Sequence, residues 1–211
     1  MSGVNADVLR LVLTIFSDLP ESELPRLDRN ESTAGHPSFE TLLKLFHKRV
    51  FNLAYRLLGD FDEAADLTQE TFVKAYKAYR RFRGTSDAAY PWLCRIAVNG
   101  CKNRFKELER RNRYETRSLD GGPESDNREI ADGSADPARI VERHDLEDKI
   151  QEVIQALPPE FRVVVILRDM QGLTYKEIAD ATGFTIETVK ARLFRGRGIL
   201  RRRFAPYLSN E

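Results

Sequence analysis

Apolar residues in this chain recur at helical spacing in five separate stretches, and nowhere do they alternate over the length of a strand. Side chains three and four residues apart share one face of a helix, whereas successive side chains of a strand point to opposite faces. We therefore predict an all-α protein. The first long stripe comprises eight apolar positions: Phe39, Leu42, Leu43, Phe46, Val50, Leu53, Ala54 and Leu57.

Capping residues predict where the helices of the first half begin and end. Ser38 is placed to cap the first stripe, and Gly59 is placed to end it. Asp62 is expected to cap the second helix. Residues 84–90 are expected to form a loop, and Pro91 is expected to be the first residue of the third helix, where a missing N–H costs nothing.

The chain is expected to hold two small helical domains, at 38–113 and 144–208, joined by an acidic linker. Within the linker, at 114–143, the stretch 115–137 holds seven Asp or Glu against two Arg and is poor in large apolar side chains. Such a composition favours a flexible tether over a packed domain. Fully extended, a tether of this length would reach on the order of 100 Å.

Several protein classes are excluded by composition. No stretch approaches the roughly 20 apolar residues that span a bilayer, and no basic segment precedes the apolar cluster at 8–16, so no signal peptide is expected. Cys94 and Cys101 lie in one predicted helix, about 10 Å apart along its axis, which is too far for a disulfide. Both are expected in the core, the protein is expected in the cytoplasm, and no metal or cofactor is expected.

A helix-turn-helix is predicted in the last quarter of the chain. Thr174 followed three residues later by Glu177 fits a capping box at the start of a short helix. Gly183 is placed to supply the turn, and Thr185 is placed to cap a long final helix. A helix, a tight turn with glycine and a second helix are the pattern that this DNA-binding motif requires.

The final helix carries a basic face. The net charge of the chain is only +1, but residues 190–203 hold seven Lys or Arg and no acid. Helical spacing places Val189, Leu193, Gly196 and Leu200 on one packed side. The alternative interpretation is a solvated basic helix without a partner. If the helix enters the major groove, Lys190, Phe194 and Arg195 are candidates to read bases, and Arg192, Arg197 and residues 201–203, beginning with Arg201, are candidates to bind phosphate.

A mixed polar stripe is predicted on the third helix, opposite Leu93, Ala97, Cys101, Phe105 and Leu108. One indole, two amides and three cations can stack on a base, bond to its edge and hold its backbone, which suits unpaired or opening DNA. The alternative is that the indole belongs to the core and the amides are incidental. The stripe comprises Trp92, Arg95, Asn99, Lys102, Asn103 and Lys106.

The second helix is expected to present a protein-docking patch centred on an exposed leucine between carboxylates, although single surface leucines are common. Its expected surface residues are Asp66, Leu67, Glu70 and Lys74, and its expected buried residues are Ala65, Thr68, Phe72, Ala75, Tyr76 and Tyr79.

Three sequence runs resemble the extracytoplasmic-function (ECF) sigma factors of bacterial RNA polymerase. The runs are LGDFDEAADLTQETFVKAYKAYRRFRG, YPWLCRIAVNGCKN and ALPPEFRVVVILRDMQGLTYKEIADATGFTIETVKARLFRGRGIL, and together they cover roughly 39–113 and 144–205 in the expected order. The resemblance implies a region 2 bundle and a region 4 helix-turn-helix. It also implies an alternative, stress-responsive sigma factor that binds core RNA polymerase, recruits it to promoters and helps to open the DNA.

The resemblance also implies roles for residues. The third-helix stripe, together with the loop at 84–90, would melt and read the −10 element, and Lys190, Phe194 and Arg195 would read the −35 element. The acidic linker would thread polymerase channels built for nucleic acid. The partners would be core RNA polymerase, through its β′ clamp helices and its β subunit, and an anti-sigma factor, often membrane-bound. Contact with the clamp helices of the β′ subunit would fall to Asp66, Leu67, Gln69, Glu70 and Phe72.

Some questions stay open at the level of sequence. Residues 1–37 exceed the family minimum, and they are interpreted as a docking arm, a disordered tail or the result of a start codon assigned too early. The main rival function is an ordinary operator-binding regulator, which would need a ligand pocket or a phosphoacceptor, and nothing in 39–113 indicates either. An enzyme is not expected, since the chain has no P-loop, HExxH motif or nucleophile elbow.

Overall fold

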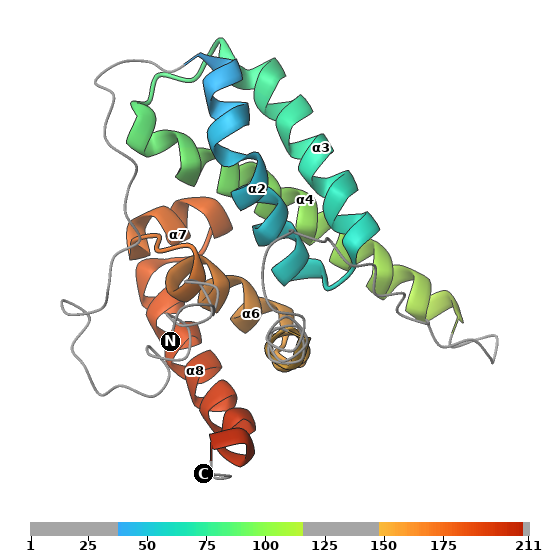
Figure 1. The fold of residues 1–211 in the computed structure, drawn as a ribbon. Coiled ribbons are helices and arrows are strands. Elements are labelled where there is room, and N and C mark those ends of the chain that lie inside the picture. The colour runs from blue at the N-terminus through green and yellow to red at the C-terminus, as the bar shows by residue number, and fades with distance from the viewer. Residues whose placement is uncertain (1–37, 116–147, 209–211) are drawn as a thin grey trace, which may run out of the picture. The chain divides into compact units, whose positions relative to one another are not determined.

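The computed structural model describes residues 38–115 and 148–208, which lie in two separate units (Figure 1). Within these two ranges every regular element is a helix, so the all-α prediction is confirmed. The predicted extension at 1–37 and almost all of the predicted linker at 114–143 lie outside the described residues. In the part of the chain that is described, no helix is both long enough and apolar enough to cross a membrane.

The first unit is built from three helices, α2 (Phe39–Leu58), α3 (Phe61–Tyr79) and α4 (Ser86–Glu115), and each packs against the other two. In Figure 1, α2 and α3 run beside one another and the longer α4 crosses them. Because every helix contacts both of the others, each must bury side chains over more than one narrow stripe of its surface. Large side chains that are almost completely buried include Leu42, Leu53, Leu57, Leu67 and Leu93.

The boundaries of α2 are as predicted. The side chain of Ser38 accepts a hydrogen bond from the Thr41 amide at 3.1 Å, and Gly59 ends the helix in the left-handed conformation with φ 82°. The predicted cap of α3 is wrong by two residues. Asp60, not Asp62, accepts a bond from the Glu63 amide at 2.7 Å, because the chain turns directly from Gly59 into the new helix.

The predicted start of α4 is also wrong, since the helix begins at Ser86 and includes Pro91. Proline cannot donate the hydrogen bond that would join it to the preceding turn. The extra turn nevertheless forms because it buries Ala89 and Tyr90, whose ring lies 5.3 Å from that of Phe46. This apolar contact with α2 offsets the missing hydrogen bond, and it shortens the predicted loop to the residues before Ser86.

The second unit contains a helix at 148–155, then α6 (Pro159–Val165), the π-helical segment η1 (Ile166–Met170), α7 (Tyr175–Thr182) and α8 (Ile186–Leu208). Both α6 and α7 pack on α8. The π-helical segment was not predicted. The buried Arg162 joins the first two helices by donating to the carbonyl groups of Gln155 and Leu157, which satisfies acceptors left open at a helix end.

Candidate nucleic-acid and protein interfaces

Both helices of the predicted helix-turn-helix, α7 and α8, begin at the predicted caps. Glu177 accepts a bond from the Thr174 amide at 2.7 Å, and the Thr174 hydroxyl accepts one from the Glu177 amide at 3.3 Å, so the capping box is present. Gly183 has φ 75°, a conformation that few residues other than glycine adopt readily. The Thr185 hydroxyl then accepts from the Thr188 amide at 3.2 Å at the start of α8. The helix-turn-helix is therefore confirmed.

The packed face of α8 also matches the prediction. Val189, Leu193 and Leu200 are buried, and Gly196 is buried between them. A Cβ atom at Gly196 would lie 2.7 Å from the Cγ2 atom of Val165, closer than two carbon atoms can approach. The absence of a side chain at this position therefore allows α8 to lie directly against α6.

The opposite face of α8 is open and basic. Phe194 is 82% exposed, the largest exposed fraction among the large apolar side chains of the described residues. An aromatic ring in this position contributes nothing to a core, and it is surrounded in sequence by cations. The exposed positions of this face are Lys190, Ala191, Phe194, Arg195, Arg201 and Arg202, and Arg203 is also exposed.

Arg197 does not belong to this open face, and the expectation that it is free to bind phosphate is corrected. Its guanidinium donates two hydrogen bonds to Asp169, from Nε at 3.1 Å and from a terminal nitrogen at 2.6 Å. The Asp169 side chain is only 1% exposed. A buried carboxylate needs a paired charge, so Arg197 serves the interior of the unit.

Two further cations of α8 lie over aromatic rings, which the sequence did not predict. The guanidinium carbon of Arg192 lies 3.9 Å from the centre of the Phe184 ring. The Lys190 ammonium lies 5.5 Å from the centre of the Tyr175 ring, within the range of a cation–π contact. Both rings come from α7 or the turn, so these cations are oriented before any partner is bound.

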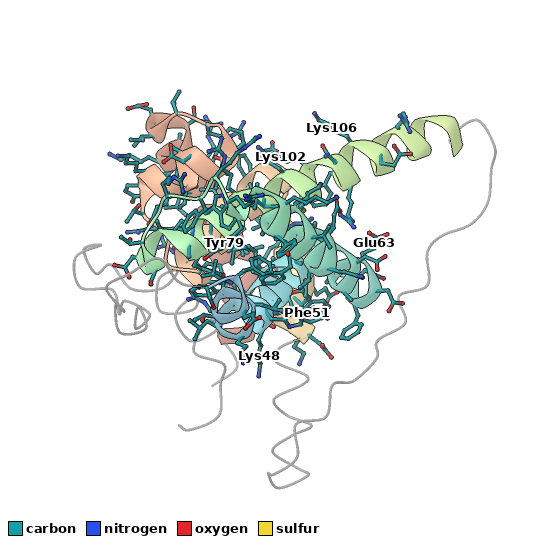
Figure 2. All side chains as sticks on the ribbon, turned by 90° about the horizontal axis from the view of Figure 1, so that it is seen from above. Lys48, Phe51, Glu63, Tyr79, Lys102 and Lys106 are labelled. Carbon is teal, nitrogen blue, oxygen red and sulfur yellow. The ribbon has the colours of Figure 1, made fainter. Side chains whose placement is uncertain are left out.

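The polar stripe of α4 is largely where it was predicted. Arg95, Asn99, Asn103 and Lys106 are exposed, and Lys102 is half-buried. Figure 2 shows Lys102 and Lys106 along the same side of α4. On the opposite side Leu93, Ala97 and Cys101 are buried as predicted, Phe105 is only half-buried, and both Cys94 and Cys101 are free buried thiols.

Trp92 combines features of the two interpretations that the sequence left open. Its ring stacks on Phe82 with a centroid distance of 4.7 Å and an interplanar angle of 29°. Phe82 is buried, whereas Trp92 is half-buried. The indole is therefore anchored by one neighbour without being enclosed, and it remains accessible at the start of the stripe.

The predicted faces of α3 are wrong in part. Leu67, predicted to be exposed, is 1% exposed, whereas Tyr76, predicted to be buried, is 66% exposed. Ala65 is exposed and Tyr79 is half-buried, while the burial of Thr68, Phe72 and Ala75 is confirmed. The error arises because α3 packs against both α2 and α4. Leu67 faces α4 at Gly100, where a Cβ atom would lie only 2.5 Å from the Leu67 Cδ1 atom.

The surface of α3 is therefore centred on residues other than the predicted leucine. Asp66 and Gln69 are exposed, and Val73 and Tyr76 are exposed apolar side chains. Their spacing of three and four residues places all four on one side of the helix. The helical spacing of these four residues was visible in the sequence, but the more apolar positions around Leu67 led to a different assignment of the exposed face.

Glu70 lies beside this face and is engaged by two cations. One carboxylate oxygen pairs with Lys74, and the other accepts a bond from Arg104 of α4 at 2.8 Å. Arg104 also donates to Glu63 at 2.9 Å. Hydrogen bonds from Lys74 and Arg104 hold the pKa of the Glu70 carboxyl below its ordinary value.

Comparison with known proteins identifies the two units. Residues 42–111 match Sigma-70 region 2, and residues 147–200 match Sigma-70, region 4. The RNA polymerase sigma-H factor of Pseudomonas aeruginosa is 33% identical over 189 residues, which cover 87% of this chain and 92% of that protein. This chain is an ECF sigma factor. The ECF RNA polymerase sigma-E factor of Escherichia coli K12 is 32% identical over 177 residues, 81% of this chain and 88% of that protein.

Solved structures also resemble this ECF sigma factor. The sigma factor RpoE from Bartonella quintana, solved with the anti-sigma factor NepR, matches with a TM-score of 0.60 and 25% identity, over 79% of this chain and 96% of that one. CnrH, solved with the cytosolic domain of CnrY, matches in fold with a TM-score of 0.52 at 19% identity, over 98% of this chain and 100% of that one.

Membership of the family establishes the activity of the molecule. ECF sigma factors bind core RNA polymerase and direct it to promoters, and this chain does the same. The three-helix unit belongs to region 2, and the helix-turn-helix unit belongs to region 4.

Proposed function

We propose that α8 reads the −35 element through Lys190, Phe194 and Arg195. The observation that carries this proposal is the almost complete exposure of Phe194 on a helix face that has no acidic side chain between residues 190 and 203. An arginine can donate two hydrogen bonds to guanine, and an apolar ring can contact the methyl group of thymine. The exposed cations at 201–203 are then placed to contact phosphates, and Arg192 to support them from beside Phe184.

The stripe of α4 is proposed to hold the −10 element once its strands separate. Trp92 supplies an accessible ring that is anchored on Phe82. Asn99 and Asn103 present exposed amides that can bond to base edges, and the cations Arg95, Lys102 and Lys106 follow the backbone. This combination of ring, amides and cations is the one that binds single strands. The residues just before Ser86 complete this surface.

The exposed side of α3 is proposed to dock on the clamp helices of the β′ subunit. We assign the contact to Asp66 and Gln69, together with the apolar side chains of Val73 and Tyr76. Aromatic residues are frequent anchors of protein interfaces, and Tyr76 is open to solvent in this unit. Leu67 and Phe72, which the family resemblance placed in the contact, lie beneath this surface and support it.

Several broader assignments complete the proposal. The domains are assigned to 38–113 and 144–208, with 114–143 as a linker and 1–37 as an extension, and the β subunit of the polymerase is a proposed partner beside β′. The protein acts in the cytoplasm and has no catalytic activity of its own. An anti-sigma factor is a further proposed partner, because the similar sigma factor RpoE from Bartonella quintana was solved in complex with the anti-sigma factor NepR.

The test is promoter selection by reconstituted holoenzyme. Randomised promoters would be selected with holoenzyme containing the wild-type chain, Phe194→Ala, Arg195→Ala or Asn103→Ala. We expect the first two changes to alter the preferred −35 sequence alone, and the third to alter the −10 sequence alone. Lys149→Ala, a loss of charge on the helix at 148–155, is the matched control. An unchanged −35 preference in both α8 variants would exclude the assigned base-reading role.

A further inference from the structure

The two proposed surfaces of region 2 lie on adjacent helices, α3 for the polymerase and α4 for DNA. Between them lies a cluster of four residues, Leu67 and Glu70 on α3 and Gly100 and Arg104 on α4. We call this cluster, with Glu63, the α3–α4 latch. The position that a Cβ atom would occupy at Gly100 lies 2.5 Å from Leu67, 3.8 Å from Arg104 and 4.0 Å from Glu70.

Arg104 is the only cation of the latch that reaches across from α4. Its Nε donates to Glu63 at 2.9 Å and a terminal nitrogen donates to Glu70 at 2.8 Å. Glu63 and Glu70 are seven residues apart, which is about two turns of helix. One planar guanidinium with several fixed donors can bridge two such carboxylates, whereas the single ammonium of lysine cannot do so equally well. The side chain of Arg104 is only 22% exposed.

Glu70 is occupied on both oxygens, by Lys74 and by Arg104. A carboxylate that already accepts from two cations gains little from a third, so Glu70 is poorly suited to supply an ion pair to the polymerase. Glu70 suits a different task, because its partner Arg104 directly follows Asn103 of the DNA stripe.

We infer that Arg104 is a positioning residue that fastens the polymerase-docking helix to the DNA-holding helix, so that α4 keeps its place while promoter strands separate. This inference rests on the proposed roles of α3 and α4. When α3 is held by the polymerase, strand separation pulls on α4. The ion pairs of the latch, over the close contact of Leu67 with Gly100, resist sliding of one helix along the other.

The test compares duplex and pre-opened promoters in reconstituted holoenzyme containing the full chain. A fluorescent base in the −10 element reports opening. With Arg104→Gln we expect opening of the duplex promoter to slow several-fold, while affinity for core polymerase and binding to a template with a preformed bubble stay within about twofold. A loss of stability alone would affect both templates. Arg104→Lys, which retains the charge, is expected to give an intermediate rate and also tests the inference if Arg104→Gln folds poorly.

Two comparisons make the result specific. Arg110→Gln removes a cation from the same helix, but Arg110 pairs with Glu107 of α4 itself, so opening should be unchanged. Glu70→Gln should slow opening, and adding Arg104→Gln should slow it little further, because both changes break the same contact. Additive slowing in the double variant, a loss of binding to the bubble template as large as the loss of opening rate, or wild-type opening by Arg104→Gln would each overturn the inference.

The proposed function can fail separately. If Asn99→Ala and Asn103→Ala leave opening unchanged, the DNA role of α4 is excluded and the latch has nothing to position. If these variants are defective while Arg104→Gln opens promoters as the wild type does, the DNA role stands and only the latch is excluded.

Discussion

The carboxylate of Asp169 in η1 accepts two hydrogen bonds from the guanidinium of Arg197 in α8, and the carboxylate is almost completely buried. This pair ties the DNA-facing helix to the segment that precedes the helix-turn-helix. Because Arg197 is paired inside the unit, it does not contribute its charge to the basic face of α8. The charge on the outside of α8 is carried by residues whose side chains are exposed.

Replacing Arg197 should destabilise region 4. In Arg197→Ala the buried carboxylate of Asp169 loses its partner, and we expect unfolding to become easier by about 2–3 kcal/mol, below the figure for a fully buried pair because Arg197 retains some exposure. Chemical denaturation measures this change. Arg202→Ala, which removes another exposed cation of the same helix, should stay within about 0.5 kcal/mol of wild type. If Arg197→Ala were as stable as the wild type, a structural role for the Asp169–Arg197 pair would be excluded.

Arg195 and Arg201 should differ in how they affect DNA binding. Arg195→Ala is expected to cost about 1–3 kcal/mol on the preferred promoter and to relax discrimination at one position of the −35 element. Arg201→Ala should weaken binding to all sequences evenly and make the slope of log affinity against log salt concentration shallower by about 0.9. Titrations of holoenzyme on matched promoters at several salt concentrations separate the two. If Arg195→Ala lowered the affinity for all promoter sequences equally, its base-reading role would be contradicted.

Tyr76 should matter more for polymerase binding than for folding. Its ring packs edge-on against Phe39 with a centroid distance of 5.1 Å, but its side chain is 66% exposed, so Tyr76→Ala is expected to cost no more than about 1 kcal/mol of stability. If the ring anchors the interface, affinity for core polymerase should fall by about 2 kcal/mol. Leu45→Ala, an exposed apolar residue of α2, is the control. Competition with a labelled sigma factor for core measures the affinity, and equal behaviour of the two variants would remove Tyr76 from the contact.

The sequence predicted those parts of the fold that depend on neighbouring residues. Ser38, Gly59, the pair Thr174–Glu177 and Gly183 were all assigned correctly, because a cap or a turn is formed within a few residues of the chain. The face of α8 was also predictable, because its packed side lies against neighbouring helices of one small unit and its other side is open.

The sequence could not predict features that depend on contacts between distant segments. The buried side of α3 was predicted wrongly in part because two helices cover α3. Periodicity alone does not show which of its apolar residues remain exposed to solvent. The early start of α4 depends on the contact of Tyr90 with Phe46. The role of Arg197 depends on Asp169, which belongs to a π-helical segment without a sequence signature. In each case a partner distant in sequence decided the outcome.

Two glycines of α8 should respond in opposite ways to the same substitution. At Gly198 a Cβ atom would meet nothing within 4 Å, so Gly198→Ala should stabilise region 4 by up to about 1 kcal/mol through its higher helix propensity. At Gly196 the same atom would lie 2.7 Å from Val165, and overpacking of about 1–3 kcal/mol should exceed this gain.

Denaturation of the full chain compares these two glycine variants under identical conditions. We expect a net loss of stability of about 1 kcal/mol for Gly196→Ala. Because the displaced helix carries Phe194 and Arg195, we also expect weaker promoter binding by Gly196→Ala and not by Gly198→Ala. Stabilisation by both substitutions would show that α6 and α8 have room to separate, and that the close approach at Gly196 does not set the position of the DNA-facing helix.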